Sequence, residues 1–194
     1  SPDQLEPHMM ATAVDYGQEA IRDQQFAIIE DVCKRYDVDG IELDFMRQPI
    51  YFRPTFEGQP VEQEYIALMT DFMRRLRHMT EEVGHQRDRP LLIACLLPSR
   101  VRLCLNIGLD VEAWLKDDLI DVITSSLERE QFTGPIHEMV ALGHQHDTPV
   151  YACLSATGSS FQGIDLMAGW AGAATHAYNA GVDGLSTYNH FNPP

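Results

Sequence analysis

Two carboxylates stand two residues apart in the segment V-D-G-I-E-L-D-F, residues 38–45. Glu42 and Asp44 alternate there with three apolar residues, Ile41, Leu43 and Phe45. Successive side chains of a β-strand point to opposite faces, so a strand here places the carboxylates on one face and the apolar side chains on the other. A pair of carboxylates is costly in a dry core. The face is therefore either the wet face of an edge strand or the inner face of a barrel strand that opens into an active site.

Glycoside hydrolysis is one chemistry that such a pair can support. This reaction uses two carboxyl groups, separated by roughly 5–5.5 Å for retention and 6.5–9.5 Å for inversion. Neighbours on one strand face lie about 6.6 Å apart at Cα, so Glu42 and Asp44 can act together. A more usual arrangement pairs Asp44 with a carboxylate from another strand. Glu128 and Glu130, in S-S-L-E-R-E, are the best candidates in this sequence, and solvated loop charges are the alternative interpretation of both.

Residues that follow the strands are candidates for substrate binding. Arg47 follows the carboxylate strand and either clamps a hydroxyl or carboxylate of a sugar or simply holds Asp44. Tyr188, Asn189 and His190 follow the last apolar run, and they serve either sugar binding or ordinary capping of the strand. An aromatic face stacks on a sugar ring, while amide and imidazole groups bind hydroxyls.

The segments that must position these residues alternate between strand and helix patterns. Apolar residues at helical spacing or in short continuous runs divide the chain into predicted elements. Strands are expected at 39–45, 91–97, 120–126, 149–155 and 182–188, helices at 16–36, 61–83, 134–146 and 164–180, short helical pieces at 101–117, and a loop rich in proline and aromatics at 48–60. Regular alternation of this kind predicts a parallel sheet built from strand–helix units.

The spacing of the units favours part of a barrel. The triplet V-D-G opens the strands at 38 and at 182, and four units in that interval average about 36 residues, near the roughly 31 of a (β/α)8 barrel. Five strands correspond either to the C-terminal five units of a TIM barrel, incomplete or closed by a partner, or to a complete open sheet. The first is favoured because the chain begins with a helix pattern and has no glycine in R-Q-P-I-Y-F-R-P after its first strand.

Composition narrows the classes of function. The 194 residues include 29 Asp and Glu against 14 Lys and Arg, a formal net charge of −15. This charge argues against a nucleic-acid partner and against binding to anionic membranes. No apolar run approaches the roughly 18–20 residues that span a bilayer, and no signal peptide is visible, so the compartment stays open. The four cysteines form no C-x-x-C pair and are expected to be buried free thiols.

Four blocks of sequence, taken in order, resemble a known family. They are A-V-D-Y-G-Q-E-A-I-R-D, Y-D-V-D-G-I-E-L-D-F-M-R-Q-P, I-G-L-D-V-E-A-W-L-K-D-D-L-I-D and A-G-V-D-G-L-S-T-Y-N-H-F. The set is similar to the glycosyl hydrolase-like family 10 group of bacterial proteins, over most of residues 11–192. The resemblance implies a (β/α)8 barrel that acts on carbohydrates, with strands four to eight inside this sequence and strands one to three upstream of Ser1.

The sequence therefore leads to two hypotheses of different class. The first is a glycoside hydrolase in which Asp44 is nucleophile or general acid/base, with Glu42 or Glu128 as the second carboxyl group. The second is a catalytically inactive carbohydrate-binding barrel, or a barrel fragment that needs a partner segment. No cofactor or metal motif is present, so neither is expected. Five strands leave two unpaired edges, which predicts a homo-oligomer that covers them.

Overall fold

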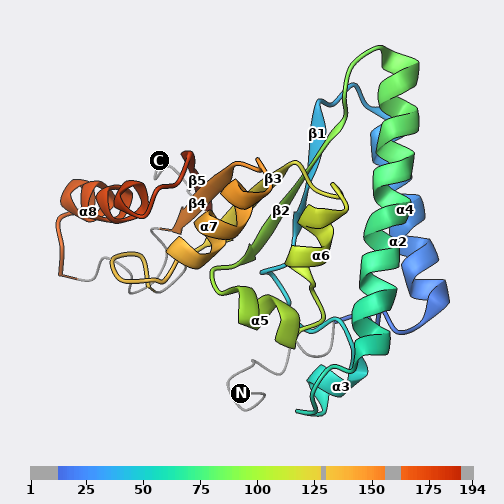
Figure 1. Ribbon diagram of the computed structural model, residues 1–194, viewed down its shortest axis with the longest axis horizontal. Helices are drawn as coiled ribbons and strands as arrows, with labels where there is room; N and C mark the ends of the chain where they lie inside the picture. The colour runs from blue at the N-terminus through green and yellow to red at the C-terminus, as the bar shows by residue number, and fades with distance from the viewer. Residues whose placement is uncertain (1–12, 128–129, 156–162, 189–194) are drawn as a thin grey trace.

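The computed structural model describes residues 13–127, 130–155 and 163–188. In these residues five parallel strands form one sheet in the order β1-β2-β3-β4-β5 (Figure 1). The strands are β1 (Gly40–Asp44), β2 (Leu92–Pro98), β3 (Val122–Ser126), β4 (Val150–Ser155) and β5 (Gly184–Tyr188), and the helices are α2 (Glu19–Arg35), α3 (Arg53–Phe56), α4 (Gln63–Arg87), α5 (Val101–Asn106), α6 (Val111–Lys116), α7 (His137–Gln145) and α8 (Leu166–Asn179). The sheet curls into a half-barrel, and the expected partial (β/α)8 architecture is confirmed.

The register separates the two faces of the sheet. Asp44 pairs with Leu96, Leu96 with Thr124, and Thr124 with Tyr151, so these side chains form one row on the inner face. The row beside it contains Glu42 and Ala94. Residues at the alternate positions of all five strands point to the outer face, which the helices cover. Those of the central strands, such as Ile93, Ile123 and Ala152, are buried.

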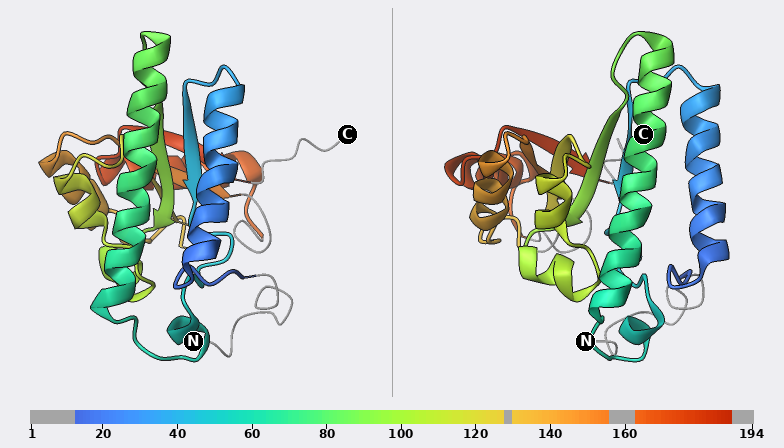
Figure 2. Two further views of the ribbon diagram at one scale, coloured as in Figure 1. Left: turned by 90° about the vertical axis from the view of Figure 1, so that its right-hand side faces the viewer. Right: turned by 45° about the vertical axis from the view of Figure 1, so that its right-hand side comes forward.

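The core lies between the outer face of the sheet and the helices. In α4, buried residues recur every three or four positions, and Met69, Met73 and Leu76 are fully covered. Trp114 of α6 is also buried, and its indole N–H donates to Thr70. Figure 2 shows α2 and α4 side by side along β1 and β2. Burial of this apolar surface is the main source of stability for such a fold.

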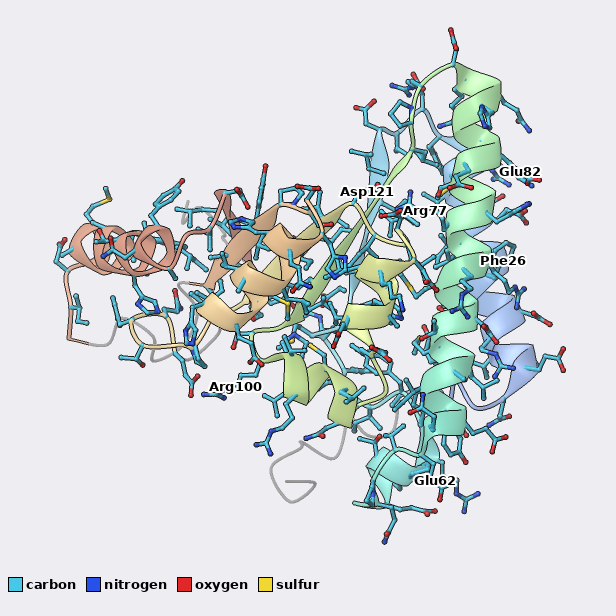
Figure 3. The ribbon with its side chains drawn as sticks, viewed as in Figure 1. Phe26, Glu62, Arg77, Glu82, Arg100 and Asp121 are labelled. Atoms are coloured by element: carbon cyan, nitrogen blue, oxygen red, sulfur yellow. The ribbon has the colours of Figure 1, made fainter. Side chains whose placement is uncertain are left out.

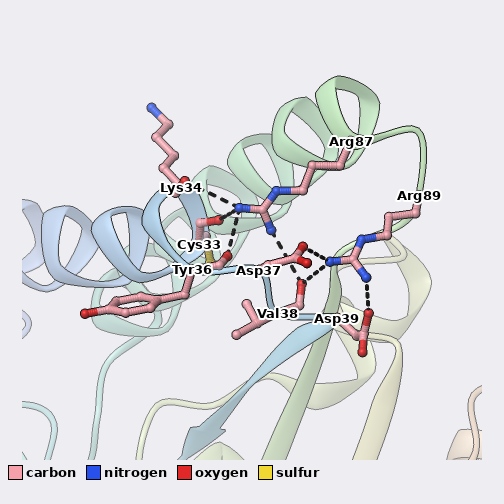
Figure 4. Close-up of polar contacts among 8 residues, drawn as sticks. All are labelled: Cys33, Lys34, Tyr36, Asp37, Val38, Asp39, Arg87 and Arg89. Carbon is pink, nitrogen blue, oxygen red and sulfur yellow. Dashed lines mark hydrogen bonds and ion pairs between the residues drawn. The ribbon is translucent and has the colours of Figure 1, made fainter.

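Charged contacts fix the ends at which the strands begin. Arg87, at the end of α4, donates to main-chain carbonyls of the α2–β1 turn, including that of Tyr36 at 2.9 Å (Figure 4). Arg89 forms ion pairs with Asp37 and Asp39 in the same turn. A similar contact recurs before β3, where Asp121 accepts from the main-chain N–H of Ile93 at 2.7 Å. These contacts hold neighbouring strands at a fixed offset.

Several apolar side chains of the half-barrel are exposed, and three groups of them bear on its open edges and inner face. On α2, Ile28 and Val32 are four residues apart and exposed on one side of the helix, and Tyr36, directly after the helix, is exposed as well. At the opposite end of the molecule, Met167 of α8 is 74% exposed. On the inner face, Leu92 and Tyr151 are 41% and 39% exposed, although a closed barrel fills this space with side chains. Exposed apolar side chains therefore occur beside both open edges and on the concave face, and also on α5 at Leu103 and Leu105.

Two segments differ from the expected ones, at the end of α4 and in the expected loop at 48–60. The helix expected at 61–83 continues to Arg87 and ends where Asp88 takes a positive φ of 55°. The expected loop at 48–60 contains the single turn α3, which has Pro54 near its start, a position that suits proline. None of the described helices combines the length and the apolar character needed to cross a bilayer.

Candidate functional site

Asp44 lies where β1 ends, at the edge of the sheet where barrel enzymes place their reacting groups. Its Oδ1 accepts hydrogen bonds from the main-chain N–H groups of Met46 at 2.8 Å and Arg47 at 3.1 Å. These bonds turn the chain away from the strand, as aspartate often does in turns. The structure gives Oδ2 no hydrogen-bond partner among the described residues, and the side chain is exposed. The second oxygen of Asp44 is therefore available to a ligand.

Glu42 lies deeper on the same face and reaches across the sheet. Its Oε1 accepts a hydrogen bond of 2.7 Å from the hydroxyl of Thr124 on β3. The strand between them places the small side chain of Ala94 beside Glu42, which leaves room for the carboxylate to pass over β2. Thr124 is 3% exposed, so its hydroxyl is a fixed donor. The expectation that Glu42 and Asp44 share the open inner face agrees with this geometry.

Arg47 and Tyr188 bring the two edges of the sheet together. The guanidinium carbon of Arg47 lies 5.5 Å from the centre of the Tyr188 ring, within the range of a cation–π contact. Arg47 follows β1 and Tyr188 ends β5, so these residues come from opposite ends of the strand order. The contact shows that the sheet curls enough for both of its edges to border one opening at the C-terminal ends of the strands. This opening, between Arg47 and Tyr188, is called the mouth below. Arg47 contacts Asp44 through its main-chain N–H alone, and the two side chains form no described ion pair.

The loop after β3 supplies a second charged group and one residue that the sequence did not reveal. Glu130 pairs with Arg100 at 2.8 Å, and no described contact links it to Glu42 or Asp44. Gln131 is 1% exposed; its amide donates to the carbonyl of Ser155, and its Oε1 accepts from the Ser155 N–H at 3.3 Å. Gln131 thus fixes the end of β4. No spacing rule singles out a lone glutamine in a loop.

Three of the residues expected in the site lie outside the described residues. They are Glu128, Asn189 and His190. The strands that precede them in the sequence, β3 and β5, end at the same edge of the sheet as β1, because the strands are parallel. Their roles stay predictions.

Aromatic side chains pack against Phe45, the residue that follows β1. The hydroxyl of Tyr51 donates to the carbonyl of Phe45 at 2.7 Å, and the two rings meet edge to face. Burial raises the pKa of the Tyr51 phenol, so this group stays a neutral donor. Phe45 also packs against Trp114. This packing holds the residue that follows Asp44 in a fixed position.

Two of the buried cysteines, Cys95 and Cys104, do not add a nucleophile to the site. All four cysteines are buried and unlinked, as the sequence predicts. Burial raises the pKa of Cys104 to about 12, and it raises that of Cys95 as well. The thiols of Cys95 and Cys104 are therefore protonated at neutral pH and unreactive. Among the described residues, no three His, Cys, Asp or Glu side chains gather as metal ligands.

A cavity of about 400 Å³ lies at the other end of the strands. Arg77, Asp121 and Arg89 contribute to its lining. Figure 3 places Arg77 and Asp121 toward one end of the sheet and Arg100 toward the other. Arg77 pairs with Asp121 at 2.9 Å, and Asp121 also binds the start of β2. These charges hold strands in place, so this cavity is separate from the carboxylates of β1.

No family model matches the chain, and no curated protein matches it. Solved structures do match the chain. The PgaB (BpsB) glycoside hydrolase domain from Bordetella bronchiseptica aligns with a TM-score of 0.57 and 16% identity, over 88% of this chain and 57% of that chain. The carboxyl transferase domain of Rhizobium etli pyruvate carboxylase, a variant with pyruvate, aligns with a TM-score of 0.52 and 14% identity, over 84% of this chain and 27% of that chain.

These similarities concern the fold. At such identities, shared architecture carries many unrelated chemistries, so the alignments support a partial TIM barrel and assign no reaction. The chain spans little more than half of the glycoside hydrolase domain and about a quarter of the carboxyl transferase chain. The barrel implied by the resemblance to glycosyl hydrolase-like family 10 agrees with these structures. Membership of that family stays a proposal.

Proposed function

We propose that the protein is a glycoside hydrolase whose substrate binds in the mouth at the C-terminal ends of the strands. Asp44 is one of the two catalytic carboxyl groups, acting as nucleophile or general acid/base. Glu42, or Glu128 from the loop after β3, is the second. Arg47, Glu130 and the segment Tyr188–His190 bind the sugar.

The observation that carries the proposal is the contact between Arg47 and Tyr188. It supports a single mouth in which the carboxylates of β1 and the aromatic ring of β5 can meet one ligand. An acidic pair, a ring and a guanidinium are the groups with which proteins commonly orient and cleave sugars. One carboxyl group protonates the glycosidic oxygen, while the other attacks the anomeric carbon or activates a water molecule.

The two carboxylates differ in their hydrogen-bond partners, and this difference suits them to different roles. Glu42 is oriented by the hydroxyl of Thr124, whereas Asp44 keeps one oxygen that has no partner among the described residues. A nucleophile or base needs an oxygen that is open to substrate. Asp44 is therefore the better candidate for direct contact with the sugar, and Glu42 the better candidate for a fixed partner.

The test is a screen of glycans for release of reducing ends, with wild type, Asp44→Asn and Asp88→Asn. Asparagine at 44 keeps an oxygen for the turn, while the carboxylate is lost. Asp88 is exposed near the opposite end of the strands with positive φ, which asparagine tolerates, so Asp88→Asn is a matched control. We expect turnover by wild type and by Asp88→Asn, and a loss of at least about 100-fold in Asp44→Asn. Equal turnover by wild type and both variants would show that Asp44 is not a catalytic residue.

A catalytically inactive carbohydrate-binding barrel is the second candidate. The exposed inner-face side chains Leu92 and Tyr151 favour it, because an interior open to water does not exclude solvent from a reacting bond. The same screen separates the two: an inactive barrel binds a glycan in both wild type and Asp44→Asn and releases no reducing ends from either.

The open edges also bear on partners. We propose that a second copy of the chain covers at least one of them. Parallel strands with unpaired N–H and C=O groups beside exposed apolar helices are prone to association. Both edges of this half-barrel combine the two features, since the exposed apolar residues of α2 flank β1 and Met167 and Tyr178 belong to α8.

A further inference from the structure

In a protein rich in acids, Arg47 has no carboxylate partner for its side chain among the residues that the structure describes. The sequence has 29 Asp and Glu against 14 Lys and Arg. Most of the described Lys and Arg side chains form ion pairs with carboxylates, including Arg100 at the same mouth and Arg77 at the other end of the strands. The side chain of Arg47 forms none among the described residues. Its charge is therefore available at the mouth.

The position of this charge is determined at both ends of the side chain. Asp44 fixes the main chain of Arg47 by accepting its N–H at 3.1 Å. The guanidinium then lies over the ring of Tyr188 at 5.5 Å. In this arrangement the guanidinium covers the ring face that would stack on a sugar. A ligand can use that face only if Arg47 moves.

We propose that the site takes a sugar that carries a carboxylate, and that this carboxylate draws Arg47 away from Tyr188. The inference rests on the proposed function. The planar guanidinium forms two parallel hydrogen bonds with a carboxylate, a stronger interaction than its contact with a ring at an exposed site. The exchange satisfies the charge of Arg47 and uncovers the ring for the sugar. A neutral sugar has no group that compensates for the lost contact.

This exchange predicts effects of opposite sign when Arg47 is replaced by glutamine. An acidic oligosaccharide loses its charged partner and binds about 10-fold or more weakly. A neutral oligosaccharide no longer has to displace the guanidinium, and it binds about two- to fivefold more tightly. A cation that serves only as a general attraction for anions would give the first effect without the second.

The experiment measures affinity by titration calorimetry in the Asp44→Asn variant, which keeps the ligand intact. The probes are oligogalacturonate, oligoglucuronate and oligomannuronate, each with its methyl ester as the matched neutral ligand. Arg47→Gln is compared with Lys116→Gln, both added to Asp44→Asn. Lys116 is an exposed residue at the end of α6 that forms no described ion pair, so its loss changes the net charge equally.

We expect at least one acid to bind about 10-fold more tightly than its ester. Arg47→Gln should weaken the binding of the acid and strengthen the binding of the ester. Lys116→Gln should change neither affinity by more than about twofold, because exposed charges are screened by salt. Equal binding of acid and ester would overturn the inference and leave the hydrolase proposal standing. Binding of none of these probes would also overturn it, and the neutral glycan screen then decides the proposed function separately.

Discussion

The carboxylates of β1 are held by different neighbours, and this difference has a measurable consequence. Glu42 accepts the hydroxyl of the buried Thr124 at 2.7 Å, whereas Asp44 uses one oxygen for the turn that follows the strand. The alternation with Ile41 and Leu43 predicts the shared face of the carboxylates from sequence. Thr124 is 82 residues away from Glu42 in the chain, so no local pattern predicts that contact.

Replacement of Thr124 tests whether Glu42 must be oriented. Thr124→Val removes the hydroxyl and keeps the shape of the side chain, while Thr124→Ser keeps the donor. If Glu42 is the second catalytic group, we expect Thr124→Val to lower the hydrolysis rate by about 10-fold, and Thr124→Ser to retain most of it. The free energy of unfolding should change by less than about 1.5 kcal/mol in both variants. Full activity in Thr124→Val would show that Glu42 has no oriented role.

At the scale of elements, the start of β5 depends on an aspartate. Oδ2 of Asp183 accepts from the N–H of Val150 at 2.8 Å and lies 2.9 Å from Nε2 of His144. The Val150 N–H, and after it His144, lower the pKa of the Asp183 carboxyl. A pKa that is lower in the folded state adds stability above the unfolded value, and this stability is lost as the pH falls through the folded pKa.

The Asp183→Asn variant should therefore be less stable than wild type at pH 7. In acid, the difference between their free energies of unfolding should become smaller. The expected difference in the free energy of unfolding at pH 7 is about 0.5 kcal/mol, because the pair is partly exposed and solvent screens it. Urea unfolding at a series of pH values from 7 down to below 4 measures it. A difference that stays constant over the whole series would contradict the role given to the carboxylate.

The packing of α7 on β4 requires a glycine. A Cβ atom at Gly143 would lie 2.4 Å from Cγ2 of Val150 and 2.9 Å from the carbonyl oxygen of Thr148. Alanine in an exposed helix interior stabilises by about 1 kcal/mol relative to glycine. Here we expect Gly143→Ala to destabilise by about 1–3 kcal/mol because the clash forces the helix off the strand.

A matched variant in α8 controls for helix propensity. At Gly172 the nearest atom to an added Cβ is Cε1 of Phe132 at 3.1 Å, which belongs to a side chain that can give way. Gly172→Ala should therefore change the free energy of unfolding by less than about 1 kcal/mol. Thermal or urea unfolding measures both, and a higher midpoint for Gly143→Ala would contradict the close approach.

The elements themselves follow from the sequence more readily than the site does. The apolar runs at 91–97 and 149–155 predict strands within about a residue of β2 and β4, because the strands of a parallel sheet are mostly buried and form nearly continuous apolar runs. Helix ends are harder, since α4 stops at a backbone turn at Asp88 and its apolar pattern ends earlier. The contact of Arg47 with Tyr188 depends on the curl of the whole sheet, which local patterns do not encode.

At the scale of the whole molecule, the open edges predict self-association. Light scattering of the purified protein should give a mass of twice the 21.9 kDa of one chain. Ile28→Glu places a charge among the exposed apolar residues of α2, and Met167→Glu places one on α8. The variant that reverts to a single chain identifies the covered edge. A monodisperse monomer for wild type would contradict the proposal.

A sugar is proposed to bind on the inner face, where the strands end. Amide NMR spectra of the protein, recorded with and without a glycan that it binds, locate this binding site. The shifted signals are expected to cluster at Asp44, Arg47, Thr124 and Tyr188. Shifts confined to the residues that line the opposite cavity, from Arg77 to Leu91, would contradict this proposal.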